Sequence, residues 1–142
     1  MKRFRFPLQT ALELRERAVE AAERGLREAQ QQWADNQRNE QELAREISDA
    51  EQAAIAGPID PADMVSLSRY RAAVSRRRQT LAQQGAAIAR LIVERQTALQ
   101  TAERDRTLLA RLKEKSKARW QQDADKEQQQ LAEEAFLSRW GR

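Results

Sequence analysis

The chain has 142 residues, with 26 Lys and Arg against 22 Asp and Glu, a formal net charge of +4 and a pI near 9.9. It contains no Cys and no His, which excludes disulfides, thiolate or imidazole catalysis and a zinc site of the usual kind. Charged residues make up 34% and aromatic residues 5%, a composition typical of long helices and coiled coils. The opposite charges are interspersed, which favours a solvated helix surface over a nucleic-acid groove.

One break interrupts the chain at residues 56–61, which hold Gly57, Pro58 and Pro61. Proline removes a backbone donor and clashes with the preceding helical turn, and glycine costs entropy in a helix. We therefore predict an all-α fold with a helix over about 7–56, a turn at 57–60 and a helix over about 61–138. Pro7 and Pro61 suit the first helical position, and Asp60 suits the N-cap. The two helices are expected to form an antiparallel coiled-coil hairpin that is a single domain over residues 1–142.

Sustained seven-residue apolar spacing predicts the seam of this coiled coil and argues against disorder. In the first helix the rows are Leu12, Val19, Leu26, Trp33, Glu40, Ile47, Ala54 and Leu8, Arg15, Ala22, Ala29, Asn36, Leu43, Ala50. In the second helix they are Leu67, Val74, Leu81, Ile88, Arg95, Ala102, Leu109 and Tyr70, Arg77, Gln84, Leu91, Ala98, Asp105, Leu112.

Folding at the break predicts a register in which facing residues have numbers that sum to about 117. Leu43 then faces Val74, and Ile47 faces Tyr70. Glu40, the acid on the first seam, faces Arg77, which suggests a register-setting polar layer. The alternative is that both side chains extend to water. The same register places Gly85 beside Trp33.

The second helix is expected to continue for roughly 30 residues, about 45 Å, beyond the start of the first. In this overhang the apolar spacing changes from seven to an eleven-like repeat, through Leu112, Trp120, Ala124, Leu131, Ala135 and Ser138. A basic stretch (Arg111, Lys113, Lys115, Lys117, Arg119) precedes an acidic one (Asp123, Asp125, Glu127, Glu133, Glu134). An apolar stripe without an intramolecular partner is expected to bind another protein.

Four of the seven aromatic residues lie near the ends of the chain: Phe4, Phe6, Phe136 and Trp140. Exposed aromatics are typical interface anchors, and the alternative for the phenylalanines is that they fix the start of the first helix. Arg76, Arg77 and Arg78 form a basic run that could contact phosphate or an acidic partner, or could be solvated. No residues form a catalytic or cofactor-binding pattern, so we expect no enzyme and no cofactor. No apolar run approaches the roughly 18 residues of a membrane span, so no integral membrane segment is expected.

The opening segment, Phe4-Arg5-Phe6-Pro7-Leu8-Gln9 followed by Thr10 to Arg17, resembles the Phe-x-Phe-x-Leu-Gln start and Leu/Arg/Glu-rich helix of the FliJ family. The length, the two-helix plan and the charged C-terminal stretch are also similar to this family of flagellar type III export stalk and chaperone-escort proteins. The resemblance implies an antiparallel coiled coil that binds the hexameric export ATPase, links it to the cytoplasmic domain of the export gate and escorts export chaperones. It also implies protein transport in flagellum biogenesis, motility and chemotaxis. The expected location is the cytoplasm, peripherally associated with the inner membrane at the flagellar base.

Carried onto this sequence, the resemblance implies that the ATPase-binding residues lie in the N-terminal segment and the overhang. They are Phe4, Phe6, Leu12, Trp120, Leu131, Phe136, Leu137 and Trp140. The gate-binding residues are expected nearer the turn, at Trp33, Tyr70, Arg76 and Arg77. The alternatives are the equivalent stalk of a type III secretion injectisome, a generic coiled-coil adaptor that self-associates through the overhang, and a nucleic-acid or membrane-surface binder suggested by the pI.

Overall fold

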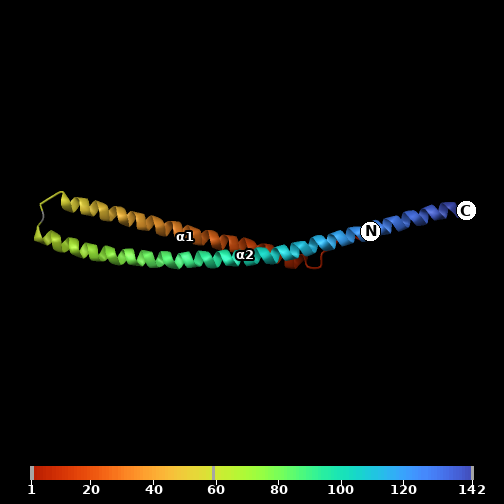
Figure 1. Cartoon of the computed structure of the whole chain (residues 1–142), viewed down its shortest axis with the longest axis horizontal. Helices are drawn as coiled ribbons and strands as arrows, with labels where there is room; N and C mark the ends of the chain where they lie inside the picture. The colour runs from red at the N-terminus through yellow and green to blue at the C-terminus, as the bar shows by residue number, and fades with distance from the viewer. Residues whose placement is uncertain (1, 59, 142) are drawn as a thin grey trace. The chain divides into compact units, whose positions relative to one another are not determined.

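The fold is all-α, as a computed structural model shows for residues 2–58 and 60–141, the part of the chain that it describes. Helix α1 spans Gln9–Ile55 and helix α2 spans Pro61–Trp140, and no strand occurs among the described residues. The predicted fold class is confirmed: two helices pack against each other as a hairpin, and the second is longer (Figure 1).

The helix ends differ from the predicted ones by two residues at most. Helix α1 begins at Gln9 rather than at Pro7, because a turn in which Gln9 N donates to Phe6 O (3.1 Å) precedes it. Helix α2 begins at Pro61, and the carbonyl of Asp60 accepts from the amides of Asp63 (3.0 Å) and Met64 (3.2 Å). Asp60 thus holds the N-cap position that the sequence predicted. Of the predicted turn, Ile59 lies outside the described residues.

The chain divides into two compact units, and each contains a segment of both helices. The hairpin unit is Ala22–Ala98, in which α1 and α2 lie side by side on either side of the turn (Figure 1). The terminal unit is Met1–Ala21 with Leu99–Arg142. Whether the whole chain behaves as one domain stays a prediction.

Each unit has a narrow core made by the predicted seam. In the hairpin unit the buried side chains include Ala29, Leu43 and Leu81, and in the terminal unit they include Phe6, Leu12 and Val19. Burying one leucine side chain contributes about 1.5–3 kcal/mol, so a few such layers carry most of the apolar stabilisation. The first-helix rows therefore predicted most of the buried face of α1, from Leu12 to Leu43, although Trp33 on the same rows is exposed.

The second seam row of α2 shifts by one residue at some of its predicted positions. At two predicted positions the more buried residue is the next one: Gly85 is buried and Leu99 is half-buried, whereas Gln84 and Ala98 are exposed. The predicted positions Leu91 and Asp105 are half-buried, as expected. An α-helix has 3.6 residues per turn rather than 3.5, so a strict seven-residue row drifts around a helix. Trp120 lies on the shifted row and Leu112, exposed, does not.

Candidate partner-binding surface

The eight residues expected to bind a partner separate into a packed group and an exposed group. Phe6 and Leu12 are buried, with 9% and 4% of their surface exposed. They belong to the core of the terminal unit, where Leu12 N also donates to Leu8 O (2.9 Å). As placed here, these two side chains stabilise the chain and offer little surface to another protein.

Phe4 and Trp120 contact each other. Their ring centroids are 5.9 Å apart with an interplanar angle of 54°, and both residues are half-buried. Tilted aromatic pairs at this separation add about 0.5–1.5 kcal/mol beyond the area they bury. The N-terminal segment before α1 is therefore held on α2 by this ring contact, and Ala124, one turn beyond Trp120, is buried as well. This packing favours the view that the phenylalanines fix the start of the first helix.

The other four residues are exposed near the C-terminal end of α2. The exposed fractions are 64% for Leu131, 60% for Phe136, 67% for Leu137 and 78% for Trp140. The rings of Phe136 and Trp140, one turn apart, have centroids 5.9 Å apart and an interplanar angle of 35°. Among the described residues of the terminal unit, Figure 1 shows no other segment beside this stretch of α2. We call Leu131, Phe136, Leu137 and Trp140 the C-terminal anchors.

Charges on α2 form two blocks before Phe136, as the sequence indicated, and Leu131 lies within the second block. The basic block runs through residues 111–119 and the acidic block through residues 123–134. Lys113 is half-buried, where it lines a cavity of ≈400 Å³ with Arg3 and Arg5. Within the described part of the chain, none of the charged side chains in either block forms an ion pair. Both blocks are thus free to contact a charged partner surface.

The expected gate-binding residues all lie in the hairpin unit, but the structure does not bring them into one patch. Tyr70 is half-buried and lines a cavity of ≈220 Å³ with Ile47. Trp33 is exposed and precedes Ile47 on α1 by 14 residues, about 21 Å at 1.5 Å per residue. Arg76 is exposed, and its Nε donates to Ala72 O (3.4 Å). Tyr70 and the arginines remain a candidate surface, and Trp33 lies apart from them.

The predicted ion pair between Glu40 and Arg77 does not form among the described residues. Nη1 of Arg77 instead lies 3.8 Å from Oε2 of Glu46, and both side chains are largely exposed. The long stems of glutamate and arginine let their charges reach water, which was the alternative that the sequence left open. The register-setting role of Glu40 and Arg77 therefore has no ion pair to support it and stays a prediction.

The buried polar residue of the seam is Asn36, four residues before Glu40. Its Nδ2 donates to the carbonyl of Leu81 at 3.3 Å, and among the described residues its buried Oδ1 has no hydrogen-bond donor. The numbers of Asn36 and Leu81 sum to 117, the value that the predicted register requires. The seven-residue spacing placed Asn36 on the seam, but the predicted polar layer was Glu40 with Arg77. Size and charge could have identified Asn36 as the buried residue, because a short uncharged amide enters a narrow seam more easily than a carboxylate.

Gly85 also has a different neighbour from the predicted one. A Cβ at Gly85 would lie 3.1 Å from Oδ1 of Asn36 and 3.8 Å from Oε1 of Glu40, so Gly85 packs against Asn36 rather than against Trp33. The atoms nearest to this glycine therefore belong to polar residues of α1, and the predicted neighbour Trp33 is not among them.

No group of three or more Asp, Glu, His or Cys side chains that could hold a metal ion occurs in residues 2–58 and 60–141. In the same residues, no helix combines the length and the hydropathy that a membrane crossing requires.

Comparison with known protein families gives a match over nearly the whole chain. Residues 4–142 match the family described as flagellar FliJ protein. No curated protein and no solved structure matches the chain.

Proposed function

Because the chain belongs to the FliJ family of flagellar type III export proteins, we propose that it acts in the export apparatus as a non-enzymatic stalk. Its partners would be the hexameric export ATPase, the cytoplasmic domain of the export gate and the export chaperones. It would work in the cytoplasm, peripherally at the inner membrane at the flagellar base, and so contribute to motility and chemotaxis.

The observation that carries the proposal is the exposure of the C-terminal anchors. Aromatic side chains that are 60–78% exposed and spaced one turn apart on a helix are expensive to leave in water and typical of interface hot spots. They follow directly on an acidic block, and a basic block lies further back on the same helix. Complementary charges on the ATPase hexamer would orient the helix as it binds, whereas the apolar anchors would supply most of the affinity.

The exposure of the eight candidate residues supports a division of the proposed ATPase contacts into direct and indirect ones. Leu131, Phe136, Leu137 and Trp140 would contact it directly, because they are exposed. Phe4, Phe6, Leu12 and Trp120 would support the interface indirectly, by holding the N-terminal segment on α2. Tyr70, Arg76 and Arg77 are retained as proposed gate contacts, and Trp33 would belong to a separate contact.

The test is binding of the full-length chain to the cognate export ATPase, with ATP hydrolysis measured in the same samples. The variant Phe136→Ala with Trp140→Ala removes two anchors from an exposed surface and leaves the packed core intact. Loss of two hot-spot side chains is expected to weaken binding at least about tenfold. If the intact chain changes the rate of ATP hydrolysis, the double variant should change it less. The matched control is Leu108→Ala, an exposed leucine on α2 of the same unit, which should leave binding unchanged.

Two results would contradict the proposal. Equal binding by the intact chain and the double variant would show that Phe136 and Trp140 are not part of the interface. Absence of ATPase binding, together with concentration-dependent self-association that the double variant abolishes, would favour the adaptor that self-associates through this region. Analytical ultracentrifugation of both proteins separates these outcomes.

A further inference from the structure

A cavity in the terminal unit lies between the N-terminal segment and α2, and all of its charged side chains are cationic. It has a volume of ≈400 Å³, and its walls are Arg3, Phe4, Arg5, Phe6, Gln9 and Lys113. This volume falls within the range of small-molecule sites in proteins, about 300–1,000 Å³. The proposed stalk function assigns no ligand to this cavity.

Packing of two aromatic side chains holds the segment that carries Arg3 and Arg5. Phe6 is buried and Phe4 is half-buried, so the segment lies against α2 rather than free in water. Lys113, half-buried on α2, completes the wall. We call Arg3, Arg5 and Lys113 the three cations. They meet at one cavity before any ligand binds, which lowers the entropic cost of binding.

No carboxylate neutralises this cavity. Within the described residues, the three cations form no ion pair. Glu13 and Glu114, the nearest acids in sequence, are not part of the wall, and Oε1 of Glu13 accepts from Nε2 of Gln9 (3.3 Å). Residues 2–12 and 106–119 together contain nine Lys or Arg and one acid, although the net charge of the whole chain is only +4. Uncompensated like charges around one cavity repel one another, and a bound anion would remove this repulsion.

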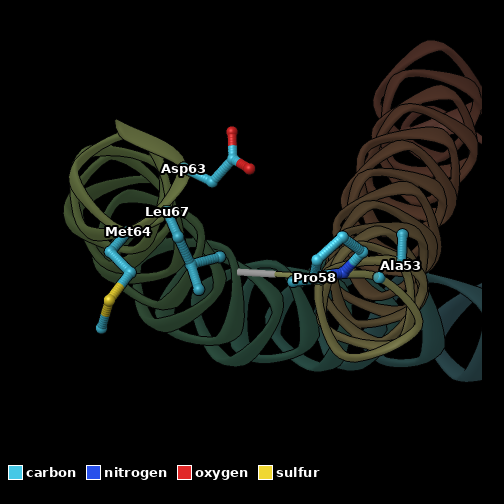
Figure 2. A pocket seen from close by; sticks show the side chains of 7 residues that line it. Ala53, Pro58, Asp63, Met64 and Leu67 are labelled. Carbon is cyan, nitrogen blue, oxygen red and sulfur yellow. The ribbon is translucent and has the colours of Figure 1, made fainter. Parts of the chain in front are cut away.

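Other cavities among the described residues differ from this one in charge. The cavity of ≈460 Å³ at the turn end of the hairpin unit has the Asp63 carboxylate beside apolar side chains (Figure 2). Three further cavities also have a carboxylate in their walls, from Glu51, Glu94 and Glu133. The cavity at the N-terminal segment is therefore distinguished by cations without an acid.

We propose that this cavity binds a small anion that carries a diphosphate group. Arginine presents a planar fork of donors that binds phosphate oxygens in pairs, and lysine adds a further charge. A phosphate group carries up to about two negative charges, so two linked groups balance the three cations, whereas a single carboxylate does not. The half-buried position of Lys113 favours a small anion over a membrane surface. The site requires neither the C-terminal anchors nor the export ATPase.

The probe is inorganic pyrophosphate, titrated into the full-length chain by isothermal titration calorimetry in a buffer without divalent cations. One pyrophosphate should bind per chain, and binding should weaken as NaCl rises from about 50 to 500 mM. Orthophosphate should bind at least about tenfold more weakly, because one phosphate group cannot contact all three cations. Hydrogen exchange should show pyrophosphate-dependent protection within residues 3–10. The combined variant Arg3→Gln, Arg5→Gln and Lys113→Gln should weaken binding at least about tenfold.

A matched control removes the same charges from the same unit. It combines Arg17→Gln, Arg104→Gln and Lys126→Gln, which are exposed and lie outside the cavity. This variant should change pyrophosphate binding by less than about twofold, because distant exposed charges contribute little. Circular dichroism checks that both variants keep their helices.

Three outcomes would overturn the proposal. Equal weakening by the two combined variants would mean that pyrophosphate responds only to net charge. Equal or tighter binding of citrate would mean that the cavity does not select phosphate. Absence of pyrophosphate binding, together with binding to vesicles of phosphatidylcholine and phosphatidylglycerol, would assign the three cations to a membrane surface instead. None of these outcomes tests the C-terminal anchors, so the proposed ATPase contact is judged separately.

Discussion

Asn36 of α1 and Gly85 of α2 meet across the hairpin seam, where a Cβ on the glycine would come within 3.1 Å of Oδ1 of the asparagine. The same asparagine donates to the carbonyl of Leu81, one turn before Gly85. A buried amide and a missing side chain thus occupy one layer of an otherwise apolar coiled coil. The contact with Asn36 explains why Gly85, a residue type that is costly inside a helix, is present in the middle of the hairpin unit.

Substituting the two helical glycines should have different effects on stability. Gly25→Ala should raise the free energy of unfolding by about 0.5–1 kcal/mol, because alanine favours the helix and the added Cβ meets only the flexible Arg95 side chain at 3.4 Å. Gly85→Ala should gain clearly less or lose stability, because its Cβ meets the buried, hydrogen-bonded Asn36. Urea denaturation followed by circular dichroism measures both. An equal gain at the two sites would show that Asn36 yields freely.

Replacing Asn36 by leucine should stabilise the hairpin and reduce its structural specificity. The change removes a buried acceptor without a donor, so we expect the free energy of unfolding to rise by about 1–2 kcal/mol. Polar seam residues restrict register and oligomeric state, so Asn36→Leu should also form larger species in sedimentation. The control Asn39→Leu changes an exposed asparagine and should not stabilise the chain. If the Asn36→Leu chain is monomeric and keeps its register, Asn36 does not restrict register or oligomeric state.

The Phe4–Trp120 contact predicts an energetic coupling in the terminal unit. A double-mutant cycle with Phe4→Ala and Trp120→Ala should give a coupling of about 0.5–1.5 kcal/mol. With Trp33 and Trp140 replaced by Phe, the emission of Trp120 should shift to longer wavelength in Phe4→Ala, because the indole gains contact with water. Phe136→Ala is the comparison: the ring of Phe136 is exposed, so this variant should barely change stability. No spectral shift in Phe4→Ala would mean that the N-terminal segment is not held on α2.

Charge reversals should distinguish the two proposed partners of Arg77. Glu46→Lys combined with Arg77→Glu should restore the small loss caused by either reversal, with a coupling of about 0.2–1 kcal/mol at low salt, because both side chains are exposed. Glu40→Lys combined with Arg77→Glu should show no such coupling. Thermal denaturation at 50 mM and 500 mM NaCl would measure both cycles. Coupling of Arg77 to Glu40 and not to Glu46 would support the register-setting layer that the sequence predicted.

The sequence by itself determined the two-helix plan, the break at residues 56–61 and the buried face of α1. These follow from local rules: proline and glycine end helices, and seven-residue spacing defines one helical face. The FliJ family could also be predicted, because the Phe4 to Gln9 segment is a local pattern, and the match over residues 4–142 confirmed it.

Only the tertiary structure decided which side chains on those faces are covered. Phe4, Phe6, Phe136 and Trp140 looked equivalent in sequence, yet Phe6 is buried, Phe4 is half-buried on Trp120, and the last two are exposed. The seven-residue pattern also could not predict that Asn36 rather than Glu40 is the buried polar residue, or that part of the α2 seam shifts by one residue. The reason is that exposure depends on what the opposite helix places across the seam, and small drifts of a 3.6-residue helix accumulate over many turns.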